Sequence, residues 1–295
     1  MDYCRLLNKD GAKYIPIIQK QFEMATLKEY PYYQKNSKGE LKQYAICPVC
    51  ENPITVVGFY NKNDKYKGKP HGRHRRYSLK GIAEYNQEAY DYCPLASRNQ
   101  AYEKDARRPM TYDKLANEIV SMLISQFDRV VYLLNKQMPF LFGATLLRSM
   151  LRTYFDALGH FFMGATLENI PWIFAYMSNN QNLYGQKLYA DSALANILRN
   201  CPEVTLKQDD ESDLVRITAS EDMFLNLTFA FVGYRKCVRN HELVELMELC
   251  IWNGRQQVYT QEIIFDTQHW FNLVNFGDGK RNQMLLKLAG EFVIA

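Results

Sequence analysis

A cluster of cysteine and histidine residues between positions 47 and 93 constrains this chain more than any other feature. Two residues, one of them a proline, separate Cys47 from Cys50 in an expected turn, and the next cysteines or histidines along the chain are His71, His74 and Cys93. Thiolates and imidazoles at such spacings bind a single metal ion. The segment between them is too polar to build an apolar core, so the pattern predicts that it folds around an ion.

Two sets of four ligands fit this spacing. The preferred set is Cys47, Cys50, His74 and Cys93, a Cys3His combination of the kind that structural zinc favours. An alternative set contains His71, which could replace His74 or Cys93, but the 20-residue gap that precedes His71 is longer than in the usual zinc finger. Four protein ligands leave no position for water, and we therefore expect Zn²⁺ with a structural role.

Positive charge is concentrated inside this cluster, in residues 61–80. Eight Lys or Arg residues stand there against one Asp, whereas the whole chain has a net charge of only +4. Cations at this density match a phosphate backbone, and interleaved tyrosines can stack on unpaired bases. We therefore expect nucleic acid as a partner, and both DNA and RNA fit the pattern. The residues expected to contact it are Lys65, Lys67, Lys69, Arg73, Arg75, Arg76, Tyr77 and Lys80.

The pattern of apolar residues changes after Pro109. Leu115, Ile119 and Leu123 begin a series at helical spacing, which predicts a helix that Thr111 caps. Further helices are expected at 139–162, 167–178, 183–199, 221–237, 240–254 and 267–295. Strands are expected only at 43–46, 54–60 and 258–265 and in a hairpin of 204–207 with 214–218.

These elements predict a mainly α protein with small β elements. The expected organisation is an N-terminal helical arm (residues 1–33), a zinc-ribbon-like α+β module that binds zinc and carries the basic stretch (34–108), and a larger, mainly helical C-terminal domain (109–295). The third region would supply a surface for homo-oligomerisation or for a protein partner.

A short motif in the last third of the chain places five residues between Arg235 and His241. It resembles the Arg-x4–6-His signature of HEPN-type ribonucleases, which are all-helical and usually dimeric. The resemblance covers the expected helices from Ser220 to Asn253. It implies metal-independent RNA cleavage in which Arg235 steadies phosphate charge and His241 transfers protons. Lys236 departs from the family, which often has a polar or acidic residue at that position.

Several classes of protein are excluded by what the sequence lacks. Phosphate-binding loops, dinucleotide-binding glycine motifs, the nucleophile elbow of serine hydrolases and the His-Glu-x-x-His motif of zinc proteases are all missing. No apolar stretch approaches the roughly 20 residues of a membrane-spanning helix, and the first ten residues do not resemble a secretory signal. Seven cysteines, an odd number, fit a reducing compartment. We therefore expect a cytoplasmic protein without a membrane partner.

The leading hypothesis is a nucleic-acid-binding protein in which a structural zinc site closes a basic, tyrosine-containing loop. It favours a binding protein over an enzyme. One alternative is the ribonuclease centred on Arg235 and His241. The other is a protein-interaction adaptor with a structural zinc module, whose basic loop meets an acidic protein.

Overall fold

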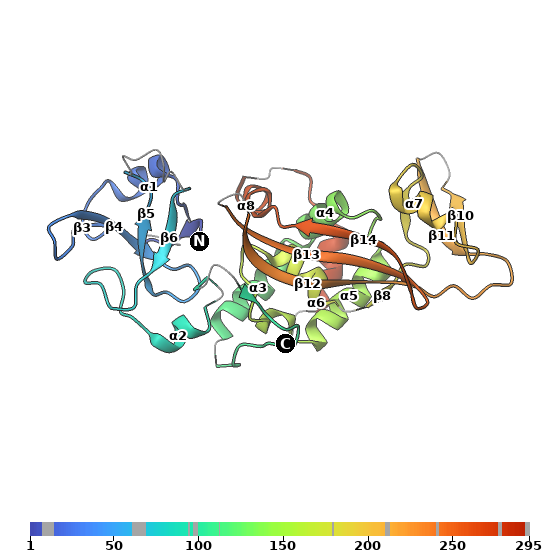
Figure 1. Ribbon diagram of the computed structural model, residues 1–295, viewed down its shortest axis with the longest axis horizontal. Coiled ribbons are helices and arrows are strands. Elements are labelled where there is room, and N and C mark those ends of the chain that lie inside the picture. Colours follow the sequence, from blue (N-terminus) through green and yellow to red (C-terminus); the bar gives the residue numbers. More distant parts are fainter. Residues whose placement is uncertain are drawn as a thin grey trace. The chain divides into compact units, whose positions relative to one another are not determined.

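The computed structural model describes residues 1–7, 15–60, 69–93, 95–96, 100–111, 113–178, 180–209, 213–239, 242–276 and 279–292. The chain forms two compact units, shown as ribbons in Figure 1. Unit 1 contains Met1–Gln100 together with Lys236–Val244, and unit 2 contains Ala101–Arg235 together with Glu245–Ala295.

Unit 1 is built on a four-stranded antiparallel sheet in the order β3-β4-β5-β6. The strands are β3 (Tyr33–Lys35), β4 (Leu41–Ile46), β5 (Pro53–Val57) and β6 (His71–His74). The last four residues of β4 and the first two of β5 are buried, and β5 contains several β-branched side chains, which favour strands. The expected strands at 43–46 and 54–60 are confirmed by β4 and β5, although β5 ends at Val57.

Short elements cover this sheet. They are the strand pair β1 (Tyr3–Cys4) and β2 (Ile15–Pro16), and the helices α1 (Gln19–Thr26) and α2 (Gln87–Asp91). The Phe22 side chain of α1 is fully buried, and its ring lies 6.2 Å from the ring of Tyr33 and 5.5 Å from that of Phe59, measured between centroids. These aromatic contacts join the helix to the sheet.

Unit 2 contains most of the longest strands of the protein, although residues 236–239 of β12 and 242–244 of β13 belong to unit 1. Its main sheet is antiparallel in the order β14-β13-β12-β7, and β8 also pairs with β12. Figure 1 shows β12, β13 and β14 as three long adjacent arrows. The strands are β7 (Gln100–Ala101), β8 (Gln181–Asn182), β12 (Leu227–Arg239), β13 (Glu242–Asn253) and β14 (Gln256–Ile264).

Helices pack against one another and against this sheet through one large apolar core. They are α3 (Asp113–Ser125), α4 (Phe127–Gln137), α5 (Ala144–Asp156), α6 (Ile170–Met177), α8 (Thr267–Phe276) and α9 (Gln283–Gly290), with a short 3-10 helix η2 (Gly159–Phe161). Helix α6 is buried on every side, which fits its apolar sequence. Its Trp172 ring stacks on Phe265 with centroids 5.0 Å apart.

A smaller antiparallel sheet also belongs to unit 2. Its order is β10-β11-β9, and helix α7 packs against it. The elements are β9 (Lys187–Tyr189), α7 (Ala193–Leu198), β10 (Val204–Gln208) and β11 (Leu214–Ala219). The expected hairpin of 204–207 with 214–218 is confirmed by β10 and β11.

The prediction of a mainly α protein, with a zinc-ribbon-like module and a larger helical domain, is wrong. The described residues form four antiparallel sheets and place nearly as many residues in strands as in helices. The expected helices at 221–237 and 240–254 are instead the strands β12 and β13. The expected helix at 183–199 is reduced to α7, preceded by the strand β9.

Burial explains why β12 and β13 are strands. In β12, Leu227, Phe229 and Phe231 are buried at a spacing of two residues, which is the period of one face of a sheet. Glu245 and Glu248 of β13 follow at a spacing of three and suggest a helix face, but this strand pairs with neighbours on both sides. Tertiary pairing therefore overrides the helix propensity of its Leu, Met and Glu residues.

Among the helices of the described ranges, none is long and apolar enough to cross a membrane.

Candidate metal centre and basic surface

Cys47 and Cys50 lie in the turn that joins β4 to β5. The backbone N–H of Cys47 donates to the carbonyl of Asn52 (2.8 Å), and that of Glu51 donates to the carbonyl of Cys47 (3.2 Å). Glu51 has a φ of 56°, in the left-handed region that tight turns require. The chain therefore reverses within a few residues, so both sulfur atoms lie on one side of the turn.

Two other elements bring the third and fourth ligands to this turn. His74 is the last residue of β6 and pairs in register with Ile54 of β5. Cys93 follows α2, and its backbone N–H donates to the carbonyl of Tyr90 (3.0 Å). The four side chains thus come from three separate segments that the sheet and α2 hold together.

The ligand atoms of Cys47, Cys50, His74 and Cys93 all lie within 4.8 Å of one another and could hold a metal ion. The Cys47 and Cys93 sulfurs are 3.8 Å apart, and the His74 Nε2 atom is 3.2 Å from the Cys50 sulfur and 3.6 Å from the Cys93 sulfur. A tetrahedral ion with Zn–S bonds near 2.3 Å and a Zn–N bond near 2.05 Å requires about 3.8 Å between sulfurs and about 3.6 Å from sulfur to nitrogen. Two of the three separations match these values, and the third is shorter.

Burial makes this cluster unfavourable without a cation. Cys47 and Cys93 are almost completely buried, and burial raises the pKa of both thiols above the ordinary value. Hydrogen bonds from Cys47 and Cys93 lower the pKa of the Cys50 thiol. All seven cysteines are free of disulfides. A bound cation would stabilise the thiolates that this environment otherwise disfavours.

His71 is placed away from the group. It occupies the first position of β6, three residues before His74, and therefore faces the opposite side of the strand. Its Nδ1 atom is 3.0 Å from the carbonyl oxygen of Lys69.

Asn52 and Asn86 support the centre, although the sequence analysis did not identify them. The Asn52 side chain is fully buried; it donates to the carbonyl of Asn86 (2.9 Å) and accepts from the Asn86 backbone N–H (2.7 Å). The Asn86 side chain caps α2 by accepting from the backbone N–H of Ala89 (3.0 Å). These bonds tie the Cys47–Cys50 turn to the helix that ends before Cys93. Asparagines are common in loops, so no local pattern singles this pair out.

The expected nucleic-acid contacts divide into three groups. Lys65 and Lys67 lie outside the described residues. Lys69 forms an ion pair with Asp2 (3.1 Å). The side chains of the others lie on or after β6, and Arg73, Arg76, Tyr77 and Lys80 are exposed.

Two of the arginines rest on tyrosine rings rather than on carboxylates. The Arg75 guanidinium lies 4.9 Å from the ring centroid of Tyr44 and 4.0 Å from that of Tyr77. Arg76 lies 5.1 Å from the ring centroid of Tyr90 and donates to its hydroxyl (3.3 Å). The Tyr90 ring also meets the His74 ring edge to face, with centroids 5.3 Å apart. A chain of contacts therefore connects the candidate ligand His74 to the exposed Arg76.

The two residues that flank the undescribed part of the basic stretch are held by acidic residues of the N-terminal segment. On one side, the Tyr60 hydroxyl donates to a Glu23 carboxylate oxygen (2.5 Å), and on the other Lys69 meets Asp2. Hydrogen bonds from Tyr60, Gln19 and Lys28 together lower the pKa of the Glu23 carboxyl to about 2, so this carboxylate stays ionised in mildly acidic solution.

The structure places Arg235 in a strand, and His241 lies outside the described residues. The Arg235 Nη1 atom is 3.3 Å from a Glu248 oxygen, and its Nη2 atom is 3.5 Å from a Glu262 oxygen. Glu248 and Glu262 are direct partners across β13 and β14, and like charges in such a pair are destabilising. Arg235 therefore offsets the repulsion between these two carboxylates, and the helical setting implied by the resemblance to HEPN-type ribonucleases is wrong.

Comparisons with protein-family models, with curated proteins and with solved structures find no significant match to this chain.

Proposed function

We propose that the Cys3His group binds one structural Zn²⁺ ion. The observation that carries this proposal is the convergence of three sulfurs and one imidazole nitrogen within 4.8 Å of one another. Thiolate-rich tetrahedral sites favour zinc over harder cations such as Mg²⁺ and Ca²⁺. The four protein ligands complete the tetrahedron, which leaves no position for a reacting water molecule and assigns the ion a structural role.

The zinc proposal is tested by metal analysis. Purified protein is expected to contain about one zinc ion per chain, and Cys47→Ser is expected to lose it. Cys201→Ser is the matched control, because Cys201 is a half-buried thiol outside the group. Full zinc occupancy in Cys47→Ser would contradict the assignment.

We further propose that the metal-held region of unit 1 binds nucleic acid. Support comes from the exposed side chains of Arg73, Arg76 and Lys80, which lie on either side of the candidate ligand His74 in the sequence. Tyr77 adds a ring that is 56% exposed while Arg75 covers one of its faces. In this arrangement the three cationic side chains bind backbone phosphates of a nucleic acid, and the Tyr77 ring offers a stacking position for an unpaired base.

The experiment measures binding of a labelled single-stranded RNA of about 16 nucleotides, and of the matching DNA, between about 50 and 200 mM salt. The triple variant Arg73→Ala, Arg76→Ala, Lys80→Ala removes three positive charges from unit 1. It is expected to weaken binding for all sequences, and to make the slope of log K against log salt shallower by about two to three.

A matched control removes three charges from exposed positions of unit 2: Arg152→Ala, Lys207→Ala and Arg255→Ala. This control is expected to leave the affinity and the salt slope nearly unchanged. Equal affinity in the unit 1 variant and in wild type would overturn the nucleic-acid proposal while leaving the zinc proposal intact.

A further inference from the structure

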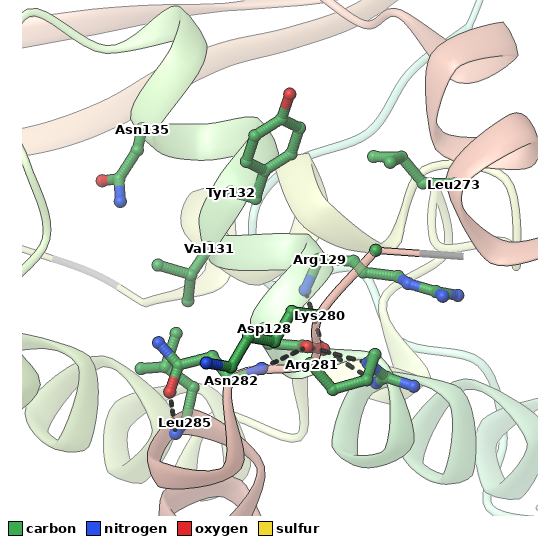
Figure 2. A pocket seen from close by; sticks show the side chains of 11 residues that line it. Asp128, Arg129, Val131, Tyr132, Asn135, Leu273, Lys280, Arg281, Asn282 and Leu285 are labelled. Atoms are coloured by element: carbon green, nitrogen blue, oxygen red, sulfur yellow. Dashed lines mark hydrogen bonds and ion pairs between the residues drawn. The ribbon is translucent and has the colours of Figure 1, made fainter. Parts of the chain in front are cut away.

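Unit 2 contains a cavity of about 510 Å³ that involves none of the metal ligands. One wall is helix α4, and the other is formed by α8 and by the residues that lead into α9 (Figure 2). This volume lies within the range of protein sites for small organic ligands, about 300 to 1,000 Å³.

Among the described residues that line the cavity, Asp128 alone has a carboxylate, and this carboxylate is fully engaged by the protein. It accepts two hydrogen bonds from the Arg281 guanidinium (2.8 Å each) and one each from the backbone N–H groups of Asn282 and Arg129 (3.0 Å). A carboxylate has about four lone-pair positions, so Asp128 has no acceptor position left for a ligand. Its pKa is lowered because the hydrogen bonds from Arg281 and its neighbours outweigh the effect of burial.

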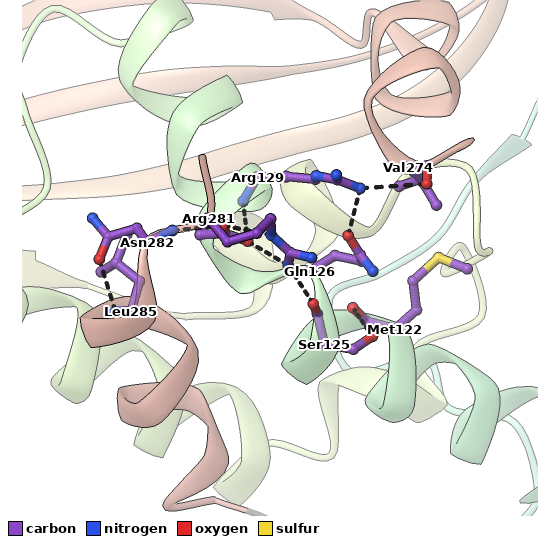
Figure 3. Close-up of polar contacts among 9 residues, drawn as sticks. Met122, Ser125, Gln126, Arg129, Val274, Arg281, Asn282 and Leu285 are labelled. Carbon is purple, nitrogen blue, oxygen red and sulfur yellow. Dashed lines mark hydrogen bonds and ion pairs between the residues drawn. The ribbon is translucent and has the colours of Figure 1, made fainter. Parts of the chain in front are cut away.

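Basic groups dominate the rest of the polar lining. Lys280 is exposed, and within the described part of the chain it has no ion-pair or hydrogen-bond partner. Arg129 donates to the Gln126 side chain (2.9 Å) and to the Val274 carbonyl (3.3 Å), as Figure 3 shows. Helix α9 begins beside this wall, and the positive end of its dipole has the same sign. The cavity therefore favours an anion.

Aromatic and apolar side chains from both walls also line the cavity. The Tyr132 side chain lines the cavity and is 45% exposed. The Lys136 ammonium lies 5.0 Å from its ring centroid, and the His269 ring meets it edge to face. Leu273 and Leu285 add apolar surface to the lining. Together these side chains suit a planar, uncharged group.

We propose that this cavity binds a nucleoside monophosphate, with the phosphate at Lys280 and the base against Tyr132. An exposed lysine and an exposed tyrosine ring within one cavity match the two chemically distinct parts of such a ligand. The same chemistry occurs in a free nucleotide and in the phosphorylated 5′ end of a nucleic-acid strand. The proposal does not depend on the nucleic-acid surface of unit 1.

Titration calorimetry of the full-length protein with AMP tests this proposal. AMP is expected to bind at least about ten-fold more tightly than adenosine, because adenosine lacks the charged group. Lys280→Ala is expected to weaken AMP binding by about ten-fold or more, and Lys280→Arg to retain most of it. Tyr132→Ala is expected to cost roughly five- to 100-fold. Lys287→Ala is the matched control, since Lys287 is an exposed lysine of α9 outside the cavity.

Unfolding curves of each variant verify that it is folded. Absence of AMP binding at millimolar concentration, equal binding of AMP and adenosine, or undiminished binding in Lys280→Ala would each overturn the proposal. If a 5′-phosphorylated oligonucleotide competes with AMP and the unphosphorylated one does not, the proposal is supported. The result would show that the phosphorylated 5′ end of a strand can occupy the cavity. If neither oligonucleotide competes while AMP binds, the free nucleotide is the source. The triple variant of unit 1 is expected to bind AMP like wild type.

Discussion

Unit 1 and unit 2 are stabilised by different means. The main apolar cluster of unit 1 contains ten buried residues, and two of them, Cys47 and Cys93, also belong to the Cys3His group. The core of unit 2 draws on its long strands and on most of its helices, with Trp172, Phe229 and Trp270 almost completely buried. A small core rarely stabilises a fold without a disulfide or a metal. Unit 1 is therefore expected to need its metal, and unit 2 to fold without one.

Both units contain ion pairs and cations on tyrosine rings, but four of their arginines differ. In unit 2, Arg281 and Arg235 pair with carboxylates. In unit 1, Arg75 and Arg76 lie on tyrosine rings, which do not cancel their charge. A guanidinium on a ring keeps its attraction for anions while its position is fixed. Arg75 and Arg76 thus keep a positive charge that ion pairing would have cancelled.

The largest expected effect is selective unfolding of unit 1 when metal is removed. Binding of structural zinc contributes on the order of 10 kcal/mol to folding in small zinc modules. Chelation is therefore expected to abolish hydrogen-exchange protection in β4 and β5 while leaving it in residues 227–235 of β12 and 245–253 of β13, which belong to unit 2. Equal loss of protection in both units would show that their stabilities are coupled and would break the comparison.

A substitution in the core of unit 2 should destabilise unit 2 and leave unit 1 folded. Phe229 is fully buried, and its ring contacts that of Phe140 with centroids 4.9 Å apart. Phe229→Ala is expected to reduce the free energy of unfolding of unit 2 by about 3 to 5 kcal/mol, because it leaves a cavity. Denaturant unfolding measures this loss, and zinc content should stay unchanged. A loss of zinc in this variant would contradict the separation of the two units.

A smaller effect, specific to unit 2, is expected from Asp128 and depends on pH. The folded-state pKa of its carboxyl is below the ordinary value of 3.8. Its contribution to stability is thus present above that value and is lost as the pH falls through the folded-state pKa. Asp128→Asn is expected to cost about 2 kcal/mol at neutral pH and to make the stability of unit 2 less sensitive to acid. An unchanged acid-unfolding profile would contradict the role of this ion pair.

The smallest expected effect comes from the ring that holds Arg75. Tyr77→Ala is expected to lower the stability of unit 1 by about 0.5 to 1 kcal/mol through loss of the cation–π contact. Tyr184→Ala is a matched control, because the Tyr184 side chain in unit 2 is also 56% exposed. Thermal unfolding of zinc-loaded protein compares the two variants. Equal shifts would indicate that the contact contributes nothing specific.

Ligand chemistry could be predicted from the sequence, but much of the topology could not. Cys47, Cys50, His74 and Cys93 stand out because few residue types bind zinc, so their identity carries the information even across 46 positions. The strands β12 and β13 were predicted as helices because Leu, Met and Glu are good helix formers. Only pairing with distant strands decides their structure, and a local window of sequence does not contain those partners.

The contacts that support the candidate metal centre and the arginines could not be predicted from local sequence for a similar reason. Asn52 and Asn86 bond to each other across 34 positions, and Arg75 lies on Tyr44 across a sheet whose register had to be known first. The aromatic character of the basic stretch was visible in the sequence. That some of the tyrosine rings contact arginines could be recognised only from the structure.

The contacts of Tyr60 with Glu23 and of Lys69 with Asp2 have a practical consequence for work on shortened versions of this protein. A fragment that starts at β3, the first strand of the four-stranded sheet, would keep all four candidate ligands and the whole basic stretch. From its sequence alone, such a fragment would seem to contain every residue needed for binding. It would nevertheless lack both carboxylates that hold the two sides of that stretch. Weak nucleic-acid binding by such a fragment would therefore reflect the loss of these two carboxylates and would not show that the basic surface is inactive.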